Sequence, residues 1–237
     1  EVQDLLNVEI SRDGDDVILR QTKYIEKLVD TFCPEGVPSK YQSTHAPCDS
    51  KLPMLVCDAL TNMDPIDPKL LREYQAIIGS LLYCATQTRP DVAFAVGYLG
   101  RAMGKPTPEL LQAAHKVLYY LHHHKHVGLR YHASAKPMSG MTDSDWATKH
   151  STSGSVFMYQ SAAISWGSKK QATIALSSTE AEIVAASEAA KEAISLHGFL
   201  HEVDEADDTP VSLACDNQSA IAVAYNPEHH PRMKHVE

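Results

Sequence analysis

Apolar residues in the first half of the chain recur at the three- and four-residue spacing of helices. The turn sequence DGDD, residues 13–16, lies between two apolar stretches and predicts a β-hairpin. A stripe that begins at Ile25 predicts a helix over residues 22–32, with Thr22 as its cap. Residues 33–68 hold six prolines and predict a long irregular connection. Three further helices are predicted, over residues 68–86, 91–103 and 107–123.

The pattern changes near residue 127, where apolar and polar residues begin to alternate. This alternation predicts four short strands, within GLRYHA, MSGMTD, GSVFMYQ and AAISWGS. A long helix is predicted over residues 174–200, followed by the strand VSLACD and the helix NQSAIAVAYN. We therefore expect an α/β domain over 127–237, with a mixed sheet and flanking helices, preceded by a mainly helical region over 1–126.

The long helix carries one carboxylate on the face that should be buried. Glu182 shares that face with apolar residues: Ala185, Ala186, Ala189, Ala193, Leu196 and Leu200. Glu180 falls on a more polar face instead. A buried, unpaired carboxylate is costly, so Glu182 needs a partner or a metal ion. A capping box is the alternative explanation, formed by Thr179 with Glu182 or by Ser177 with Glu180.

Three aspartates lie where predicted strands end. Asp143 follows MSGMT, Asp145 points the same way two residues on, and Asp216 ends VSLAC just before a helix. Taken singly, a turn explains the first two and a helix cap explains Asp216. Together with Glu182, they predict a site for hard cations such as Mg²⁺, which prefer carboxylate oxygens. Two such ions about 4 Å apart promote phosphodiester hydrolysis.

The composition is that of a globular protein with an acidic balance. The net charge of −9 argues against a protein that simply coats nucleic acid. No apolar run reaches the length of a membrane span, and no targeting signal is seen at the N-terminus. The five scattered cysteines form no C-x-x-C pair, so we expect reduced thiols. The chain begins without Met, in what reads as mid-strand, so we expect a piece of a longer polyprotein.

A series of motifs gives the chain a family resemblance. TDSDWA, STSGSVFMY, AAISWGSKKQ, ALSSTEAE, CDNQSAIA and HHPRMKH follow one another as in copia-type LTR retrotransposon polyproteins, where they form the ribonuclease H domain of the reverse transcriptase. Upstream, YQAIIGSLLYCATQTRPDVAFAV and HHHKHVGLRY resemble the region that connects the polymerase palm to that domain. The resemblance covers nearly the whole chain and implies a ribonuclease H-like fold for 127–237.

The resemblance also implies a function. The matching domain hydrolyses the RNA strand of RNA–DNA hybrids during reverse transcription, with Mg²⁺ or Mn²⁺ as cofactor. The implied catalytic residues and metal ligands are Asp143, Glu182 and Asp216, with Asp145 and Glu180 as neighbours rather than ligands. The implied partner is the polymerase part of the same polyprotein. The implied location is the cytoplasm, in a virus-like particle, or the nucleus.

The sequence departs from the family pattern in two places. The polymerase motif, an aromatic residue followed by x-Asp-Asp, is absent, so we expect no polymerase activity. In the family, a strand and a helix with a fourth acidic ligand follow the H-x-R-x-K-H motif, whereas this sequence stops at Glu237. Two alternatives stay open. One is a truncated, non-catalytic relic that binds nucleic acid or a polymerase partner, and the other is a related nuclease that acts on DNA.

Several other residues have weaker claims to a role. Four basic residues are candidates to contact nucleic-acid phosphates: Lys169, Lys170, Arg232 and Lys234. A solvated turn is the alternative explanation for the two lysines of GSKKQ. The run HHHKH, residues 122–126, places two histidines on one helix face but offers no third metal ligand. Trp146 and Trp166 have apolar neighbours, which favours core packing over stacking on a nucleotide.

Overall fold

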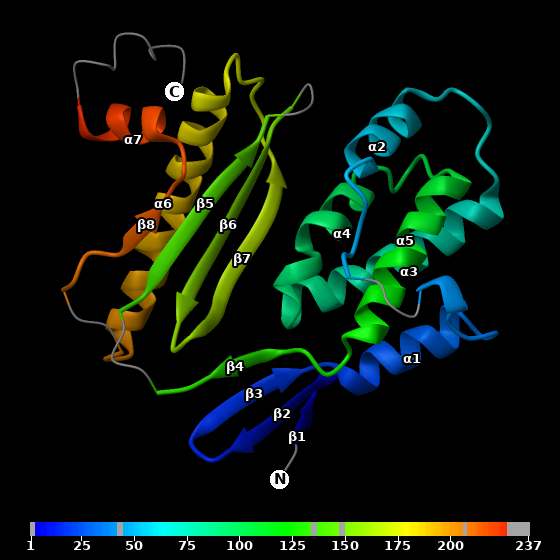
Figure 1. The fold of residues 1–237 in the computed structure, drawn as a ribbon, viewed down its shortest axis with the longest axis horizontal. Coiled ribbons are helices and arrows are strands. Elements are labelled where there is room, and N and C mark those ends of the chain that lie inside the picture. The colour runs from blue at the N-terminus through cyan, green and yellow to red at the C-terminus, as the bar shows by residue number, and fades with distance from the viewer. Residues whose placement is uncertain (1–2, 42–44, 134–136, 147–149, 206–207, 227–237) are drawn as a thin grey trace. The chain divides into compact units, whose positions relative to one another are not determined.

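Two units make up the chain, Glu1–Arg130 and Tyr131–Glu237. The structure is a computed structural model, which describes residues 3–41, 45–133, 137–146, 150–205 and 208–226 (Figure 1). Among these residues, no helix has both the length and the apolar character that crossing a membrane requires.

A sheet with the strand order β1-β2-β3-β4 belongs to the first unit (Figure 1). Its strands are β1 Gln3–Leu5, β2 Val8–Asp13, β3 Asp16–Arg20 and β4 Leu129–Tyr131. The predicted hairpin is confirmed, because Asp13 pairs with Asp16 across a turn in which Gly14 has a φ of 63°. A second turn divides the stretch that the sequence pattern predicted as one strand. There Leu6 and Asn7 adopt φ values of 53° and 62°, the left-handed conformation of a tight hairpin turn.

The described part of the first unit has five α-helices around one apolar core. They are α1 Thr22–Phe32, α2 Leu52–Thr61, α3 Pro68–Gln87, α4 Ala93–Gly100 and α5 Pro108–His123, with short 3₁₀ helices at Ser39–Tyr41 and Pro90–Val92. Helix α2 lies inside the segment that was predicted to be irregular. It forms because Leu52, Val56 and Ala59 recur at helical spacing and are buried, while Pro53 falls in the first turn, where proline is tolerated.

At the start of α1, a free backbone N–H group finds its acceptor on strand β2 rather than on the first residue of the helix. The Thr22 hydroxyl donates to the backbone oxygen of Lys125 at 3.1 Å and does not cap the helix. The backbone N–H of Lys23 instead donates to Glu9 Oε1 at 2.7 Å. Glu9 thus takes the role that the sequence pattern assigned to Thr22, because a free N–H at a helix start needs an acceptor from any source.

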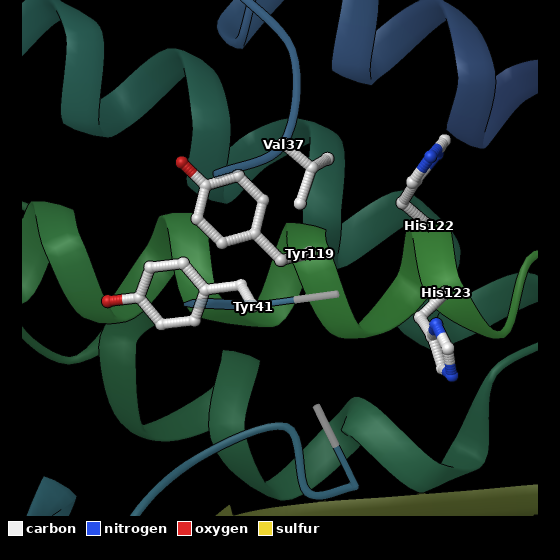
Figure 2. Close-up of a pocket in the computed structure, with 5 residues that line it drawn as sticks. All are labelled: Val37, Tyr41, Tyr119, His122 and His123. Carbon is white, nitrogen blue, oxygen red and sulfur yellow. The ribbon is translucent and has the colours of Figure 1, made fainter. Parts of the chain in front are cut away.

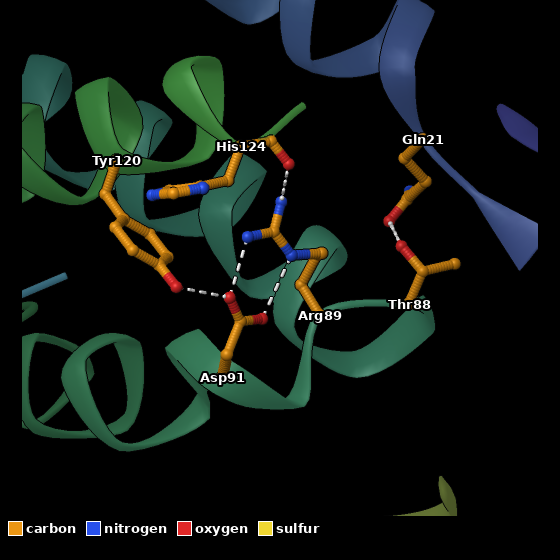
Figure 3. Close-up of polar contacts among 6 residues, drawn as sticks. All are labelled: Gln21, Thr88, Arg89, Asp91, Tyr120 and His124. Carbon is orange, nitrogen blue, oxygen red and sulfur yellow. Dashed lines mark hydrogen bonds and ion pairs between the residues drawn. The ribbon is translucent and has the colours of Figure 1, made fainter. Parts of the chain in front are cut away.

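A buried arginine joins the break after α3 to the end of α5 (Figure 3). Arg89 is 1% exposed and binds both carboxylate oxygens of Asp91, at 2.9 and 2.7 Å. It also donates to the backbone oxygen of His124 at 3.0 Å, while the Tyr120 hydroxyl donates to Asp91 at 2.9 Å. The RPD sequence therefore does more than interrupt a helix, because its two charges hold the end of α5 in place.

A mixed sheet with the strand order β7-β6-β5-β8 forms the centre of the second unit. Its strands are β5 Ser139–Asp145, β6 Thr152–Tyr159, β7 Ala162–Lys170 and β8 Ser212–Ala214. Strands β5, β6 and β7 run antiparallel, whereas β8 runs parallel to β5. The strand predicted within GLRYHA forms as β4, but it joins the sheet of the first unit instead of this one. Sequence alternation predicts that a strand exists but not which sheet it joins.

Two helices flank this sheet, α6 Ser178–Glu202 and α7 Gln218–Tyr225 (Figure 1). Helix α6 packs on β5 and β6, and α7 packs on α6. Phe157 of β6 meets Ala189 and Ala193 of α6 in the core, so small side chains let the long helix approach the sheet closely. The predicted α/β class, with a mixed sheet and flanking helices, is confirmed.

A candidate metal site in the second unit

The first turn of α6 separates the roles of its two leading glutamates. Ser177 is the N-cap, and its side chain accepts a hydrogen bond from the Glu180 N–H at 3.1 Å. The Glu180 carboxylate in turn accepts from the Leu176 N–H at 2.7 Å. Ser177 and Glu180 therefore form the cap of the helix. Glu180 is only 6% exposed, although the sequence pattern placed it on a polar face. Glu182 is left free for another role.

Glu182 lies at the junction of helix and sheet. It is 5% exposed, and its Oε1 accepts a hydrogen bond from the backbone N–H of Ser144 at 3.1 Å. The same N–H lies 2.9 Å from Asp143 Oδ1. One backbone donor on β5 thus lies close to a carboxylate oxygen from the strand and another from the helix. The face analysis of the sequence correctly placed Glu182 on the buried side of α6, but it did not foresee that Glu180 is equally buried.

The residues after β8 complete the cluster. Met141 of β5 pairs with Ala214 of β8, so the parallel register carried two residues further brings Asp216 beside Asp143. One ligand atom from each of Glu182, Cys215 and Asp216 lies within 4.8 Å of the others. Asp143 is not a member of this group, although its charge acts on Glu182. The topology therefore gathers three carboxylates and one thiol at one end of the sheet.

The electrostatics of Glu182 follow from this arrangement. Burial is the main cause that raises the pKa of its carboxyl group, and the negative charges of Asp143 and Asp216 raise it further. Hydrogen bonding to Ser144 opposes these effects but does not overcome them. Among the described residues, no lysine, arginine or histidine forms an ion pair with any of these three acids.

Such a cluster fits a cation. Ionised carboxylates that share a partly buried site repel one another unless a positive charge lies between them. The exposed Asp143 and Asp216 are free to adjust toward an ion, while Glu182 is held from one side by Ser144. The donor set is rich in oxygen, which suits the Mg²⁺ and Mn²⁺ expected from the sequence.

The other candidate residues are not members of this group of ligand atoms. Asp145 ends β5 and is half-buried, next to the cluster in sequence. Lys169 and Lys170 are exposed on the last residues of β7, opposite Ser153 and Thr152, and so belong to a strand rather than to a turn. The remaining two basic candidates, Arg232 and Lys234, lie outside the described residues.

The sequence pattern misplaced one aromatic residue and overlooked the thiol. Trp146 is 50% exposed, with its indole N–H donating to the Ala175 backbone oxygen at 3.1 Å, so it is not a core residue. Cys215 was treated as one of five scattered cysteines. Its position between the end of β8 and Asp216 was the signal that could have identified it. Its Sγ lies 3.9 Å from Glu182 Oε2.

A cavity of about 420 Å³ lies in the first unit, far in sequence from the acids (Figure 2). Its lining consists of Val37, Tyr41, Tyr119, His122 and His123. Tyr41 and Tyr119 face each other with ring centroids 4.9 Å apart, whereas the two imidazoles point in different directions. Adjacent histidines on a helix diverge, so this pair does not form a metal site.

Comparison with known proteins identifies the chain's relatives. The retrovirus-related Pol polyprotein from transposon TNT 1-94 of Nicotiana tabacum is 35% identical over 99% of this chain, which spans 18% of that polyprotein. The secreted RxLR effector protein 161 of Plasmopara viticola is 42% identical over 51% of this chain, and the matched region spans 89% of that effector. The retrovirus-related Pol polyprotein from transposon RE1 of Arabidopsis thaliana is 36% identical over 69% of this chain, which spans 12% of it.

No family model matches the sequence. One of the transposon relatives aligns with nearly all of the chain, and another aligns with about two thirds of it. The chain therefore belongs to the Pol polyproteins of copia-type retrotransposons.

Proposed function

We propose that the second unit is a ribonuclease H that hydrolyses the RNA strand of RNA–DNA hybrids during reverse transcription. The observation that carries this proposal is the convergence of Asp143, Glu182 and Asp216 at one end of the mixed sheet. The order of motifs around these residues matches the ribonuclease H region of the family. The chain spans less than a fifth of the tobacco polyprotein, so the activity of that polyprotein does not pass to this chain directly. The ribonuclease H activity of this chain is therefore a proposal.

The three acids would hold Mg²⁺ or Mn²⁺. When bound, such ions make water a stronger nucleophile and stabilise negative charge that develops on the scissile phosphate. Ser144 orients Glu182 through its backbone N–H, so this carboxylate is placed before substrate arrives. Asp143 and Asp216 are exposed to solvent, so a nucleic-acid backbone can approach them. Selection of the hybrid would rest on groove shape and 2′-hydroxyl contacts rather than on base sequence.

Hydrolysis of a labelled RNA–DNA hybrid in Mg²⁺ tests the proposal. The native chain should cleave the RNA strand, and Asp143→Asn or Glu182→Gln should lower the rate by roughly 10²-fold or more, since each removes charge that stabilises the transition state. Glu188→Gln is the matched control, because Glu188 is an exposed glutamate of the same helix. Unchanged cleavage in a correctly folded Asp143→Asn variant would contradict the site assignment.

A second candidate function is a non-catalytic protein that binds nucleic acid or a polymerase partner. One observation favours it: the tight cluster in the described residues includes two carboxylates, and Asp143 is not part of it. The relative from Plasmopara viticola also corresponds to about half of this chain and is named as a secreted effector rather than as a polyprotein. Binding of the hybrid without any cleavage in Mg²⁺ or Mn²⁺ would favour this candidate.

A further inference from the structure

Cys215 places a sulfur atom at the acidic site. The thiol is half-buried, and its Sγ lies 3.9 Å from Glu182 Oε2. The carboxylate of Asp216 completes a group of three potential ligand atoms that all lie within 4.8 Å of one another. Nothing in the ribonuclease H proposal uses this sulfur, because Mg²⁺ binds oxygen and not thiolate.

The buried carboxylate of this group is oriented toward the thiol. Glu182 is 95% buried, its Oε1 is held by Ser144, and its Oε2 points toward Cys215. No basic side chain of the described residues forms an ion pair with Glu182 or Asp216. A buried carboxylate that no described basic side chain pairs with favours the binding of a cation between these side chains.

We propose that Glu182, Cys215 and Asp216 form a site for a thiophilic divalent cation of the zinc class, which competes with Mg²⁺ for the same carboxylates. The inference rests on the metal site of the proposed function, but not on the hydrolysis assigned to it. Zinc-class cations bind carboxylate oxygen and thiolate sulfur together, at about 2.0–2.3 Å. The ligand atoms need to close by about 1 Å, which the exposed side chain of Asp216 permits.

Binding requires no redox partner. The S–H bond of Cys215 breaks, its proton leaves to solvent, and the sulfur electron pair forms the bond to the cation. A cation bound in this way would occupy the carboxylates that the proposed hydrolysis needs. Zinc-class ions would thus inhibit the proposed hydrolysis, and their removal would restore it. A site made of oxygen ligands alone does not offer this form of regulation.

Titration of the full chain with Cd²⁺ tests the inference, because cadmium thiolates absorb in the ultraviolet by charge transfer. For the native chain we expect an ultraviolet absorption that saturates as Cd²⁺ is added. The Cd²⁺ concentration at half-saturation should rise when Mg²⁺ is present. Addition of Zn²⁺ should displace the bound Cd²⁺ and remove the absorption. Cys215→Ser should abolish this saturable absorption. Cys57→Ser is the matched control, since Cys57 is an exposed thiol of the first unit, and it should leave the absorption unchanged.

A second variant tests whether the thiol and the carboxylates act together. Glu182→Gln should raise the dissociation constant for Cd²⁺ on the order of 10-fold or more. Undiminished absorption in Cys215→Ser, or an unchanged dissociation constant in folded Glu182→Gln, would overturn the inference. Hybrid cleavage by the native chain in Mg²⁺ is measured separately. Its absence would contradict the proposed function while a cadmium site at Cys215 still stood.

Discussion

The backbone N–H of Ser144 donates a hydrogen bond to the buried carboxylate of Glu182 across 3.1 Å. This bond connects the last residues of β5 to the second turn of α6, elements that are 38 residues apart in sequence. It fixes a charged group where the packing of helix on sheet would otherwise place an apolar one. Stability and proposed function therefore place opposing demands on Glu182.

Replacing Glu182 should separate these demands. In a chelator, we expect Glu182→Gln to have a free energy of unfolding equal to the native value or about 1 kcal/mol above it. The amide is uncharged and can still accept from Ser144, whereas burial disfavours the ionised form of the native carboxylate and raises its pKa. Urea denaturation followed by tryptophan fluorescence measures this, since Trp146 and Trp166 both belong to the second unit. A loss above 1 kcal/mol would show that the charge itself holds the fold.

The helix cap gives the contrasting case. Ser177→Ala should lower the free energy of unfolding of the second unit by about 1 kcal/mol, the usual cost of losing an N-cap side chain. The Glu180 N–H would lose its acceptor, and the start of α6 would fray. Ser178→Ala is the control, because Ser178 is the exposed first residue of the same helix. Equal losses in the two variants would contradict the assignment of the cap.

Divalent cations should stabilise the second unit. An ion that binds only the folded chain adds about 2.7 kcal/mol to its stability at a concentration 100 times its dissociation constant. We expect Mg²⁺ or Mn²⁺ to raise the unfolding temperature of the native chain and of Glu188→Gln. Asp216→Asn should abolish most of this rise, because it removes one ligand charge. Calorimetric scans with and without chelator measure the effect, and an equal rise in Asp216→Asn would place the ions elsewhere.

Local patterns predicted most of the elements of the fold, and nonlocal contacts explain two of the exceptions. Alternation identified the strand that became β4, but its hydrogen-bond partners are more than a hundred residues away in the first sheet. The cap of α1 is Glu9, a residue of another strand, and no pattern within the helix contains it. The six prolines of residues 33–68 led to the prediction of an irregular segment and hid the helical spacing of Leu52, Val56 and Ala59. Pro53 lies in the first turn of α2, where proline is compatible with a helix.

In the candidate site, too, local patterns predicted some features, whereas features that depend on nonlocal contacts were missed. Helix geometry alone predicted that Glu182 is buried, because a face of α6 is a local property, whereas the burial of Glu180 was missed. The contact of Cys215 with Glu182 depends on β8 adding to the sheet in parallel beside β5, which sequence spacing does not reveal. Trp146 has apolar neighbours along the chain but lies half exposed at the end of β5. Its exposure depends on where the sheet ends, and composition carries no such information.

Close packing at Gly140 gives a test of the sheet itself. A Cβ atom at this position would lie 2.5 Å from a ring carbon of Phe157, a fully buried side chain of the core. Gly140→Ala should therefore lower the free energy of unfolding by about 1–3 kcal/mol, as overpacking of a core does. Gly167→Ala is the matched control on β7, where a Cβ meets no atom within 4 Å. A destabilisation no larger than that of the control would contradict the packing at Phe157.

The Arg89–Asp91 pair should make the first unit sensitive to acid (Figure 3). Burial tends to raise the pKa of the Asp91 carboxyl, but hydrogen bonds and charge from Arg89, with help from Tyr120, outweigh it and hold the pKa below its ordinary value. The folded chain thus binds this proton less well than the unfolded chain. The stability from the ionised carboxylate is present above the ordinary pKa of about 4 and is lost as the pH falls through the lower folded value.

Asp91→Asn tests this pair at neutral pH. The substitution leaves Arg89, which is 1% exposed, without its carboxylate, and we expect a loss of about 3 kcal/mol in the free energy of unfolding. Urea denaturation followed by far-ultraviolet circular dichroism measures it, because the helices of the first unit dominate that signal. Asp49→Asn is the matched control, since Asp49 pairs with Lys116 at the surface and such pairs contribute about 1 kcal/mol or less. The difference between native and Asp91→Asn chains should shrink as the pH falls below about 4. A difference that is no larger than that of Asp49→Asn, or that persists undiminished in acid, would contradict the role of the ionised pair.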